Sequence, residues 1–295
     1  MEMKEVIQTK VQETEAVIQK YLPGRGKYQQ TAIEAMNYSM LGEGKRVRPI
    51  LMMETYRLFG GKSEVIEPFM AAIEMIHTYS LVHDDLPAMD NDDYRRGRKT
   101  THIVYGEAMG ILAGDALLNY AYETAARSFE MEPENINIGK AFEVLAKKAG
   151  IYGMVGGQVA DVLAEGTIPD KELLDFVYEL KTGALLESAM IVGAILAGAT
   201  KNEQKIIEEI AREIGIAFQI QDDILDETST MQILGKPIGS DERNKKSTYV
   251  SLVGIQRAKN EVEMRTEIAV KKLDSLVVKN TFLKEYLLFL VERKK

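Results

Sequence analysis

The chain has 295 residues, and its hydrophobic fraction of 45% is enough for a sizeable core. Its net charge of −8 argues against nucleic acid as the main partner, and the absence of cysteine excludes disulfides and thiolate sites. The longest apolar run, from Ala189 to Ala199, is too short to cross a bilayer, and the first residues lack the apolar block of a signal peptide. We therefore expect a cytoplasmic protein without stable membrane insertion.

Apolar residues recur with a helical period along most of the chain, and no stretch shows sustained alternation of the strand type. The period predicts helices over residues 4–20, 31–41, 46–59, 66–86, 103–130, 138–149, 151–164, 170–198, 203–227, 247–275 and 279–292. Polar loops are expected at residues 91–99 and 235–246. Because no Pro- or Ser-rich linker divides the chain, we predict one all-α domain over residues 1–295.

Two groups of aspartates, separated by about 130 residues, follow apolar segments in which an unpaired carboxylate is costly. The first group contains Asp84, Asp85 and Asp90, and the second contains Asp222, Asp223 and Asp226. Aspartates without cysteine or clustered histidine favour a hard cation such as Mg²⁺, which completes its coordination with water and substrate phosphate. We therefore predict a diphosphate held between two aspartate-lined walls.

The spacing within each group supports this prediction unequally. Asp222 and Asp226 are four residues apart and share one helix face, where like charges repel unless a cation joins them. Asp84 and Asp90 lie about 120° apart on an ideal helix, so their convergence requires the helix to loosen near Pro87. The alternatives are a solvated acidic helix surface for the second group and a plain acidic loop for the first.

Basic residues stand close to these acidic groups in the sequence. They form the segments Gly44–Pro49 and Arg95–Thr100, and they include Lys181 and Lys236. Arginine suits bidentate phosphate contacts, although each basic segment taken alone is more typical of a solvated surface. His77 lies within about 20° of the helix face of Asp84, but a lone histidine on an apolar helix is more often a core residue.

In order along the chain, these motifs resemble the trans-isoprenyl diphosphate synthases, and most closely the bacterial farnesyl diphosphate synthases. The residues that carry the resemblance are Gly44–Pro49, Glu74–Ser80, Asp84–Arg98, Leu112–Leu118, Gly156–Asp161, Lys181–Gly183, Phe218–Asp223 and Gly239–Tyr249. Lys99 and Val250 stand where proline is common in the family, which places the loop conformations there in doubt but not the ligands.

The resemblance implies an all-α, single-domain helical bundle of the isoprenoid-synthase type around a deep central cavity, usually as a homodimer. It implies about three Mg²⁺ ions per site, with Asp84, Asp90 and Asp222 as principal ligands and Asp85, Asp223 and Asp226 completing the walls. It assigns Arg95, Lys181 and Lys236 to the allylic diphosphate. It assigns Gly44, Lys45, Arg48, His77 and Arg96 to isopentenyl diphosphate, and Thr182 and Gln219, with Lys181, to the reacting centre.

The implied reaction is ionisation, condensation and elimination. Dimethylallyl or geranyl diphosphate ionises, isopentenyl diphosphate attacks the cation, and a proton is lost to the released diphosphate. Tyr79 is aromatic five residues before the first aspartate, and Pro87 and Ala88 match the longer motif, so the resemblance implies (2E,6E)-farnesyl diphosphate as product. A helical wheel places Ser80 more directly under Asp84 than Tyr79, so spacing alone does not choose the residue that stops chain growth.

Three other functions remain open at this point. A geranylgeranyl diphosphate synthase would share every diphosphate-binding motif. A noncatalytic subunit of a prenyl synthase generally loses one aspartate motif, whereas both are intact in this chain. A terpene cyclase is disfavoured because the basic residues suffice for a second diphosphate.

Overall fold

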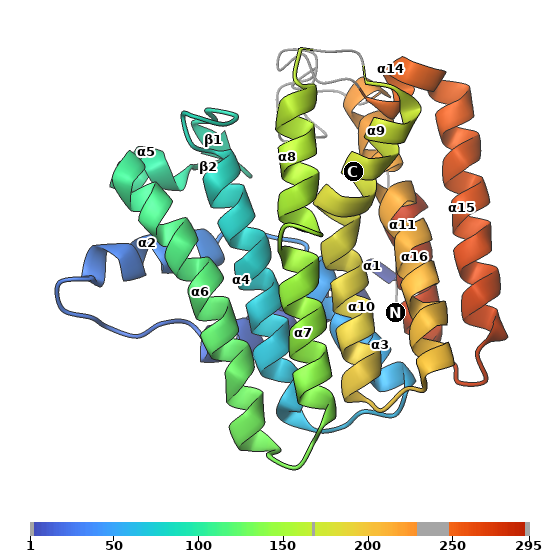
Figure 1. Ribbon diagram of the computed structural model, residues 1–295, viewed down its shortest axis with the longest axis horizontal. Helices are drawn as coiled ribbons and strands as arrows, with labels where there is room; N and C mark the ends of the chain where they lie inside the picture. Colours follow the sequence, from blue (N-terminus) through green and yellow to red (C-terminus); the bar gives the residue numbers. More distant parts are fainter. Residues whose placement is uncertain (1–2, 167–168, 229–247, 293–295) are drawn as a thin grey trace. The chain divides into compact units, whose positions relative to one another are not determined.

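Nearly all of the regular structure is helical, as the spacing of apolar residues predicts (Figure 1). The computed structural model describes residues 3–166, 169–228 and 248–292. The chain forms two compact units, one of Met1–Ile50 with Ser63–Ile138 and the other of Leu51–Lys62 with Gly139–Lys295. The all-α prediction is confirmed, and the single domain over residues 1–295 stays a prediction.

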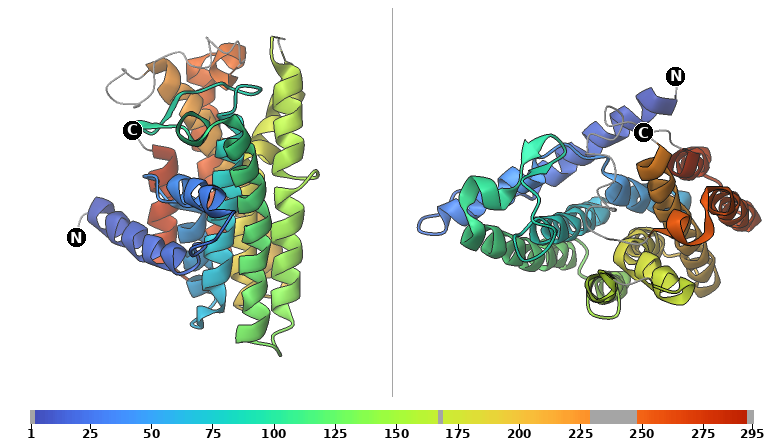
Figure 2. Two further views of the ribbon diagram at one scale, coloured as in Figure 1. Left: turned by 90° about the vertical axis from the view of Figure 1, so that its left-hand side faces the viewer. Right: turned by 90° about the horizontal axis from the view of Figure 1, so that it is seen from above.

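The first unit is built on the pair α4 and α6, which run side by side in Figures 1 and 2. Helix α4 is buried around most of its circumference, as its continuous apolar sequence requires, and Pro68 occupies its first turn. Helices α1 and α2 also pack on α4. The elements that belong to this unit are α1 (Met3–Lys20), α2 (Gln30–Met40), η1 (Glu64–Ile66), α4 (Glu67–Asp84), β1 (Tyr94–Arg95), β2 (Arg98–Lys99), α5 (Thr101–Tyr105) and α6 (Glu107–Met131). Helix α3 (Val47–Leu58) and helix α7 (Asn137–Ala149) each begin in this unit and continue into the second.

The second unit surrounds α10 (Ala184–Leu196), in which every residue is buried. This helix packs against α11 (Lys201–Thr228), which in turn packs against α15 (Ile255–Ser275), and the three run roughly parallel in Figure 1. The remaining elements of this unit are α8 (Met154–Ala164), α9 (Lys171–Val177), the π-helical segment η2 (Tyr178–Gly183), α14 (Tyr249–Val253) and α16 (Thr281–Glu292).

Three details differ from the helices expected from the sequence. The expected helix 103–130 is divided at Gly106 and the expected helix 247–275 at Gly254, because these glycines have φ of 88° and 82°, which end a right-handed helix. The expected loop 91–99 contains a short antiparallel hairpin in which Arg95 pairs with Arg98. The expected helix 170–198 contains the π-helical segment η2, a feature that is frequent at functional sites.

Among the described residues, no helix combines the length and the apolar character that crossing a membrane requires.

Candidate functional site

The first aspartate group lies where α4 ends and the chain turns back on itself. Helix α4 ends at Asp84, and the backbone N–H of Asp90 donates to the carbonyl oxygen of Asp84 at 2.8 Å. The carbonyl of Leu86 closes the turn by accepting from Met89 at 2.9 Å and from Asn91 at 3.1 Å. The predicted loosening of the helix is therefore confirmed, and it brings the backbones of Asp84 and Asp90 together.

Asp85 faces the protein interior and forms an ion pair. Its side chain is 5% exposed, and one carboxylate oxygen accepts from Arg95 Nε at 2.7 Å and Nη2 at 2.6 Å. Burial raises the pKa of Asp85, although the hydrogen bond from Arg95 opposes the shift. Burial alone would lower the pKa of Arg95, but the ion pair outweighs burial and raises it. The hairpin thus positions Arg95 beside the first aspartate group.

The residues assigned to isopentenyl diphosphate gather around His77. Burial lowers the pKa of His77 well below 6.5, and the nearby guanidinium groups of Arg48 and Arg96 lower it further. Burial also lowers the pKa of Arg48, to about 10, and lowers that of Arg96. The imidazole of His77 is consequently neutral at pH 7, and the positive charges that act on it come from arginine.

The turn before α3 closes against Arg96. Arg96 Nη1 donates to the carbonyl of Glu43 at 2.7 Å. A Cβ atom on Gly44 would lie 2.8 Å from Arg96 Nη1, so the absence of a side chain at Gly44 lets the guanidinium group cross this turn. The structure therefore brings Gly44, Arg48, His77 and Arg96 together, and Lys45 is exposed on the same turn.

In the second unit, the second aspartate group divides into two outward residues and one inward residue. Asp222 and Asp226 are half-buried one turn apart on α11, as their spacing predicts. Asp223 is 5% exposed, and its Oδ2 atom accepts from the Tyr178 hydroxyl and from the backbone N–H of Tyr249 at 2.8 Å. Asp223 therefore joins η2 and the start of α14 to α11.

The η2 segment carries the other predicted residues of this unit. Lys181 Nζ donates to Asp161 Oδ2 of α8 at 2.5 Å. Thr182 Oγ1 donates to Gln219 Oε1 of α11 at 2.8 Å, so the structure brings these two predicted residues into contact. Gln219 also lies one turn before Asp223, with its Nε2 atom 3.5 Å from Asp223 Oδ1.

Sequence reasoning did not single out Asp161, Tyr178 or Tyr249 as site residues. Asp161 ends the segment Gly156–Asp161 and Tyr249 ends the segment Gly239–Tyr249, so both could have been found as charged or polar ends of motifs. No pattern in the sequence marks Tyr178, because its hydroxyl meets Asp223 only after η2 packs on α11.

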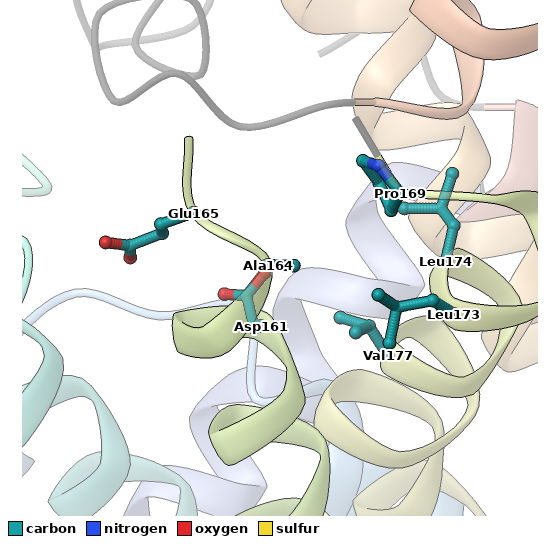
Figure 3. A pocket seen from close by; sticks show the side chains of 7 residues that line it. All are labelled: Asp161, Ala164, Glu165, Pro169, Leu173, Leu174 and Val177. Carbon is teal, nitrogen blue, oxygen red and sulfur yellow. The ribbon is translucent and has the colours of Figure 1, made fainter. Parts of the chain in front are cut away.

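A small cavity of about 20 Å³ lies beside Asp161. Asp161 and Glu165 line one side of it, and Pro169, Leu173, Leu174 and Val177 provide apolar lining (Figure 3). This volume holds roughly one water molecule, so the cavity is too small for a diphosphate.

The chemistry of the aspartates suits Mg²⁺. Asp84, Asp90, Asp222 and Asp226 are half-buried and offer only oxygen donors, and Mg²⁺ is typically bound by one or two carboxylates plus water and phosphate. Within residues 3–166, 169–228 and 248–292, no three His, Cys, Asp or Glu side chains are grouped closely enough to hold a metal ion. Lys236 lies outside the described residues.

Tyr79 and Ser80 differ in their surroundings on α4. Tyr79 is 6% exposed and meets His83 edge to face, with 5.8 Å between ring centroids. Burial raises the pKa of Tyr79 to about 12, and the nearby Tyr122 and Asp84 add to the shift. Ser80 Oγ donates to the His77 carbonyl at 2.9 Å, which keeps its hydroxyl on the backbone of its own helix.

The chain is similar to known proteins along most of its length. The family model described as polyprenyl synthetase matches residues 29–284. The chain is 45% identical to the farnesyl diphosphate synthase of Geobacillus stearothermophilus over 241 residues, covering 81% of both chains. It is 46% identical to the geranylgeranyl diphosphate synthase of Cyanophora paradoxa over 241 residues, covering 81% of this chain and 80% of the relative.

Solved structures give the same result for the fold. An FPP/GFPP synthase from Zymomonas mobilis matches with a TM-score of 0.86 and 32% identity, covering 98% of each chain. A geranyltransferase from Helicobacter pylori, complexed with magnesium and isoprenyl diphosphate, matches with a TM-score of 0.84 and 29% identity, covering 99% of this chain and 97% of that one.

The neutral state of His77 has a measurable consequence for stability. The folded pKa lies well below 6.5, so the unfolded chain binds more protons at this residue once the pH falls below about 6.5. The free energy of unfolding should therefore fall with pH from about 6.5 down to the folded pKa, and less steeply in His77→Gln. Urea unfolding of both proteins at several pH values measures this, and parallel curves would contradict the assignment.

Proposed function

The chain belongs to the polyprenyl synthetase family, and we propose that it condenses isopentenyl diphosphate with dimethylallyl and then geranyl diphosphate to give (2E,6E)-farnesyl diphosphate. It is a trans-prenyltransferase of the farnesyl and geranylgeranyl diphosphate synthase type. The observation that supports the finer proposal is the large buried side chain of Tyr79 on α4, five residues before that helix ends at Asp84.

We propose that Asp84, Asp90, Asp222 and Asp226 hold Mg²⁺, with Asp85 and Asp223 supporting the two groups from the interior. Bound Mg²⁺ would neutralise the charge that develops on the departing diphosphate. Asp85 holds Arg95 and Asp223 holds the backbone of Tyr249, so the inward aspartates fix the shape of each group.

The two diphosphates are proposed to bind separate basic residues. Arg95, Lys181 and Lys236 would hold the allylic diphosphate, and Gly44, Lys45, Arg48, His77 and Arg96 would hold isopentenyl diphosphate. Because His77 is neutral, it contributes a hydrogen bond rather than charge at pH 7. Arginine supplies the bidentate phosphate contacts.

The reacting centre is assigned to Thr182 and Gln219, supported by Lys181. The hydrogen bond from Thr182 to Gln219 fixes two side-chain dipoles in one place, where they can face a developing allylic cation without reorganising. The released diphosphate accepts the final proton, so the reaction needs no side-chain base. Catalysis then depends on orienting the two substrates and excluding water from the cation.

The function itself is tested with alanine at the outward aspartates. Asp84→Ala or Asp222→Ala should lower turnover by about 10³-fold, because each removes an oxygen donor for the metal that stabilises the leaving diphosphate. Asp93→Ala is the matched control, since Asp93 is exposed in the same acidic loop and is not assigned to the metal. The measurement is incorporation of radiolabelled isopentenyl diphosphate at several Mg²⁺ concentrations, and near-normal turnover in either variant would refute the metal assignment.

Product length is the second proposal and rests on Tyr79. Its ring is buried next to Tyr122 and Asp84, so it takes up volume close to the first aspartate group. The competing product, geranylgeranyl diphosphate, is the product type named for the relative from Cyanophora paradoxa. A noncatalytic subunit is disfavoured because both aspartate groups keep their outward residues.

Replacing Tyr79 should lengthen the product. Tyr79→Ala removes a buried ring and should shift the main product from C15 to C20 or longer, whereas Tyr79→Phe keeps the ring and should retain C15. Chromatography of the dephosphorylated products measures this. Mainly C20 from the wild-type protein would overturn the farnesyl proposal, and C15 from Tyr79→Ala would overturn the role of Tyr79.

We also propose a homodimer. On α6, the residues Ile111, Leu112, Phe129 and Met131 are between 41% and 50% exposed, and we propose that a second copy of the chain covers them. Light scattering should give twice the chain mass of 33.0 kDa at micromolar concentration, and Leu112→Glu should shift the mass toward that of one chain. A wild-type mass of one chain would refute the dimer.

A further inference from the structure

Glu74 and Arg46 form a buried ion pair in the first unit. Arg46 Nη1 lies 2.8 Å from Glu74 Oε1, and the two side chains are 4% and 3% exposed. Glu74 lies in the middle of α4, one turn before His77, and Arg46 directly precedes α3. A charge this deeply buried needs a partner. Glu74 is the closer and the more buried of two carboxylates beside Arg46, whose Nε also lies 3.5 Å from Oε1 of the 38% exposed Glu15.

Arg46 uses its remaining donors to shape the turn before α3. Its Nη2 atom donates to the carbonyl oxygens of Met40 at 2.9 Å and Gly42 at 2.7 Å. Its own backbone is left-handed, with φ of 47°, a conformation that a non-glycine residue keeps only when its surroundings enforce it. The ion pair with Glu74 therefore fixes a turn that would otherwise relax.

This turn carries residues assigned to isopentenyl diphosphate. Gly44 and Lys45 lie within it, Arg48 follows in the first turn of α3, and Arg96 binds it through the Glu43 carbonyl. A Cβ atom on Gly44 would lie 3.2 Å from Arg46 Nη1 and 2.8 Å from Arg96 Nη1, so both guanidinium groups border the same glycine. A displacement of Arg46 would therefore also displace the turn to which Arg96 donates its hydrogen bond.

Glu74 also acts on the arginines through its charge. Its carboxylate favours the protonated forms of Arg48 and Arg96, in each case against the effect of burial. His77 lies close to Arg46, Arg48 and Arg96 but is neutral, so it does not compensate their positive charges. Without Glu74, the mutual repulsion of the three guanidinium groups would no longer be offset by its carboxylate, which favours their separation.

We propose that Glu74, acting through Arg46 and through its charge, is the positioning residue for the arginines that bind isopentenyl diphosphate. It does not touch the substrate. This inference rests on the proposed function, because that function supplies the ligand for Arg48 and Arg96. Its consequence is selective: loss of Glu74 weakens isopentenyl diphosphate while leaving the allylic diphosphate, which is assigned to other basic residues, nearly unaffected.

A purely structural ion pair would behave differently. Removing it would lower stability and reduce the fraction of active protein, which lowers kcat without changing the KM of either substrate. Selective loss of affinity for one diphosphate is therefore the property that separates positioning from general stabilisation.

The experiment measures both KM values and kcat in Glu74→Gln and Glu74→Asp, beside Glu67→Gln. Glu67 is the matched control, because it lies on the same helix and its ion pair is with Lys20, at 3.0 Å, instead of with an arginine. We expect Glu74→Gln to raise the KM for isopentenyl diphosphate about tenfold or more, with kcat and the allylic KM within about threefold. Glu74→Asp keeps the charge and should recover part of the affinity, and Glu67→Gln should match the wild type.

A second variant keeps the test decisive if Glu74→Gln does not fold. Arg46→Met combined with Glu74→Met replaces the buried pair with apolar side chains, an exchange that often restores stability. It still lacks the carboxylate and the contacts of Arg46 with the turn, so the raised KM should persist even where the melting temperature recovers. A KM for isopentenyl diphosphate within twofold of wild type in a folded variant, or equal rises in both KM values, would overturn the inference.

Equilibrium dialysis with radiolabelled isopentenyl diphosphate separates this inference from the proposed function. Suppose that the wild type binds isopentenyl diphosphate and that Glu74→Gln binds it about tenfold more weakly. If the wild type then forms no prenyl product, the proposed function is refuted and the inference about Glu74 is not. Equal binding by wild type and Glu74→Gln refutes the inference even where the wild type is active.

Discussion

The structure depends on the compensation of charges that lie within an apolar helical framework. A carboxylate or guanidinium group taken out of water is costly unless a partner accompanies it. Asp85 is therefore paired with Arg95, Glu74 with Arg46, and Lys181 with Asp161. Under the proposed function, an anionic substrate would compete with the carboxylate of Asp85 for Arg95 and with that of Asp161 for Lys181.

The irregular backbone is concentrated around the same groups. Among the described residues, the non-glycine positions with positive φ are Arg46, Asn91 and Arg96, and all three flank the first aspartate group or the turn before α3. Each is stabilised by contacts that a regular helix would not offer, such as the bond from Arg96 to the Glu43 carbonyl. The π-helical segment η2 plays the corresponding part in the second unit, where it presents Lys181 and Thr182 on consecutive positions. Among the described non-glycine residues, positive φ thus occurs next to side chains that are proposed to bind the substrates.

The sequence predicted those parts that depend on local spacing. Helical periodicity located most helices, and the i, i+4 spacing of Asp222 and Asp226 was sufficient to place them on one face of α11. The inward orientation of Asp223 could not be predicted, because its partners Tyr178 and Tyr249 approach only through tertiary packing. The different roles of Arg46 and Arg48 were also hidden, since neighbouring arginines in one motif look alike until Glu74 is placed beside one of them. The breaks at Gly106 and Gly254 were missed because glycine inside an apolar pattern does not reveal the sign of φ.

Overall similarity to known relatives does not decide the product length of this chain. The relatives named as farnesyl and geranylgeranyl diphosphate synthases are 45% and 46% identical to this chain over similar lengths, so overall similarity does not distinguish the two products. Under the proposed function, side chains whose volume limits the growing prenyl tail would set the product length. Within the first unit, Tyr79 fits this requirement better than Ser80, because its ring is large and buried close to Asp84, whereas the Ser80 hydroxyl is small and bonded to its own helix. A helical wheel considers only the direction of each side chain relative to Asp84, and it favours Ser80. A side chain that stops the growth of the prenyl tail must also fill space, and the larger side chain is that of Tyr79.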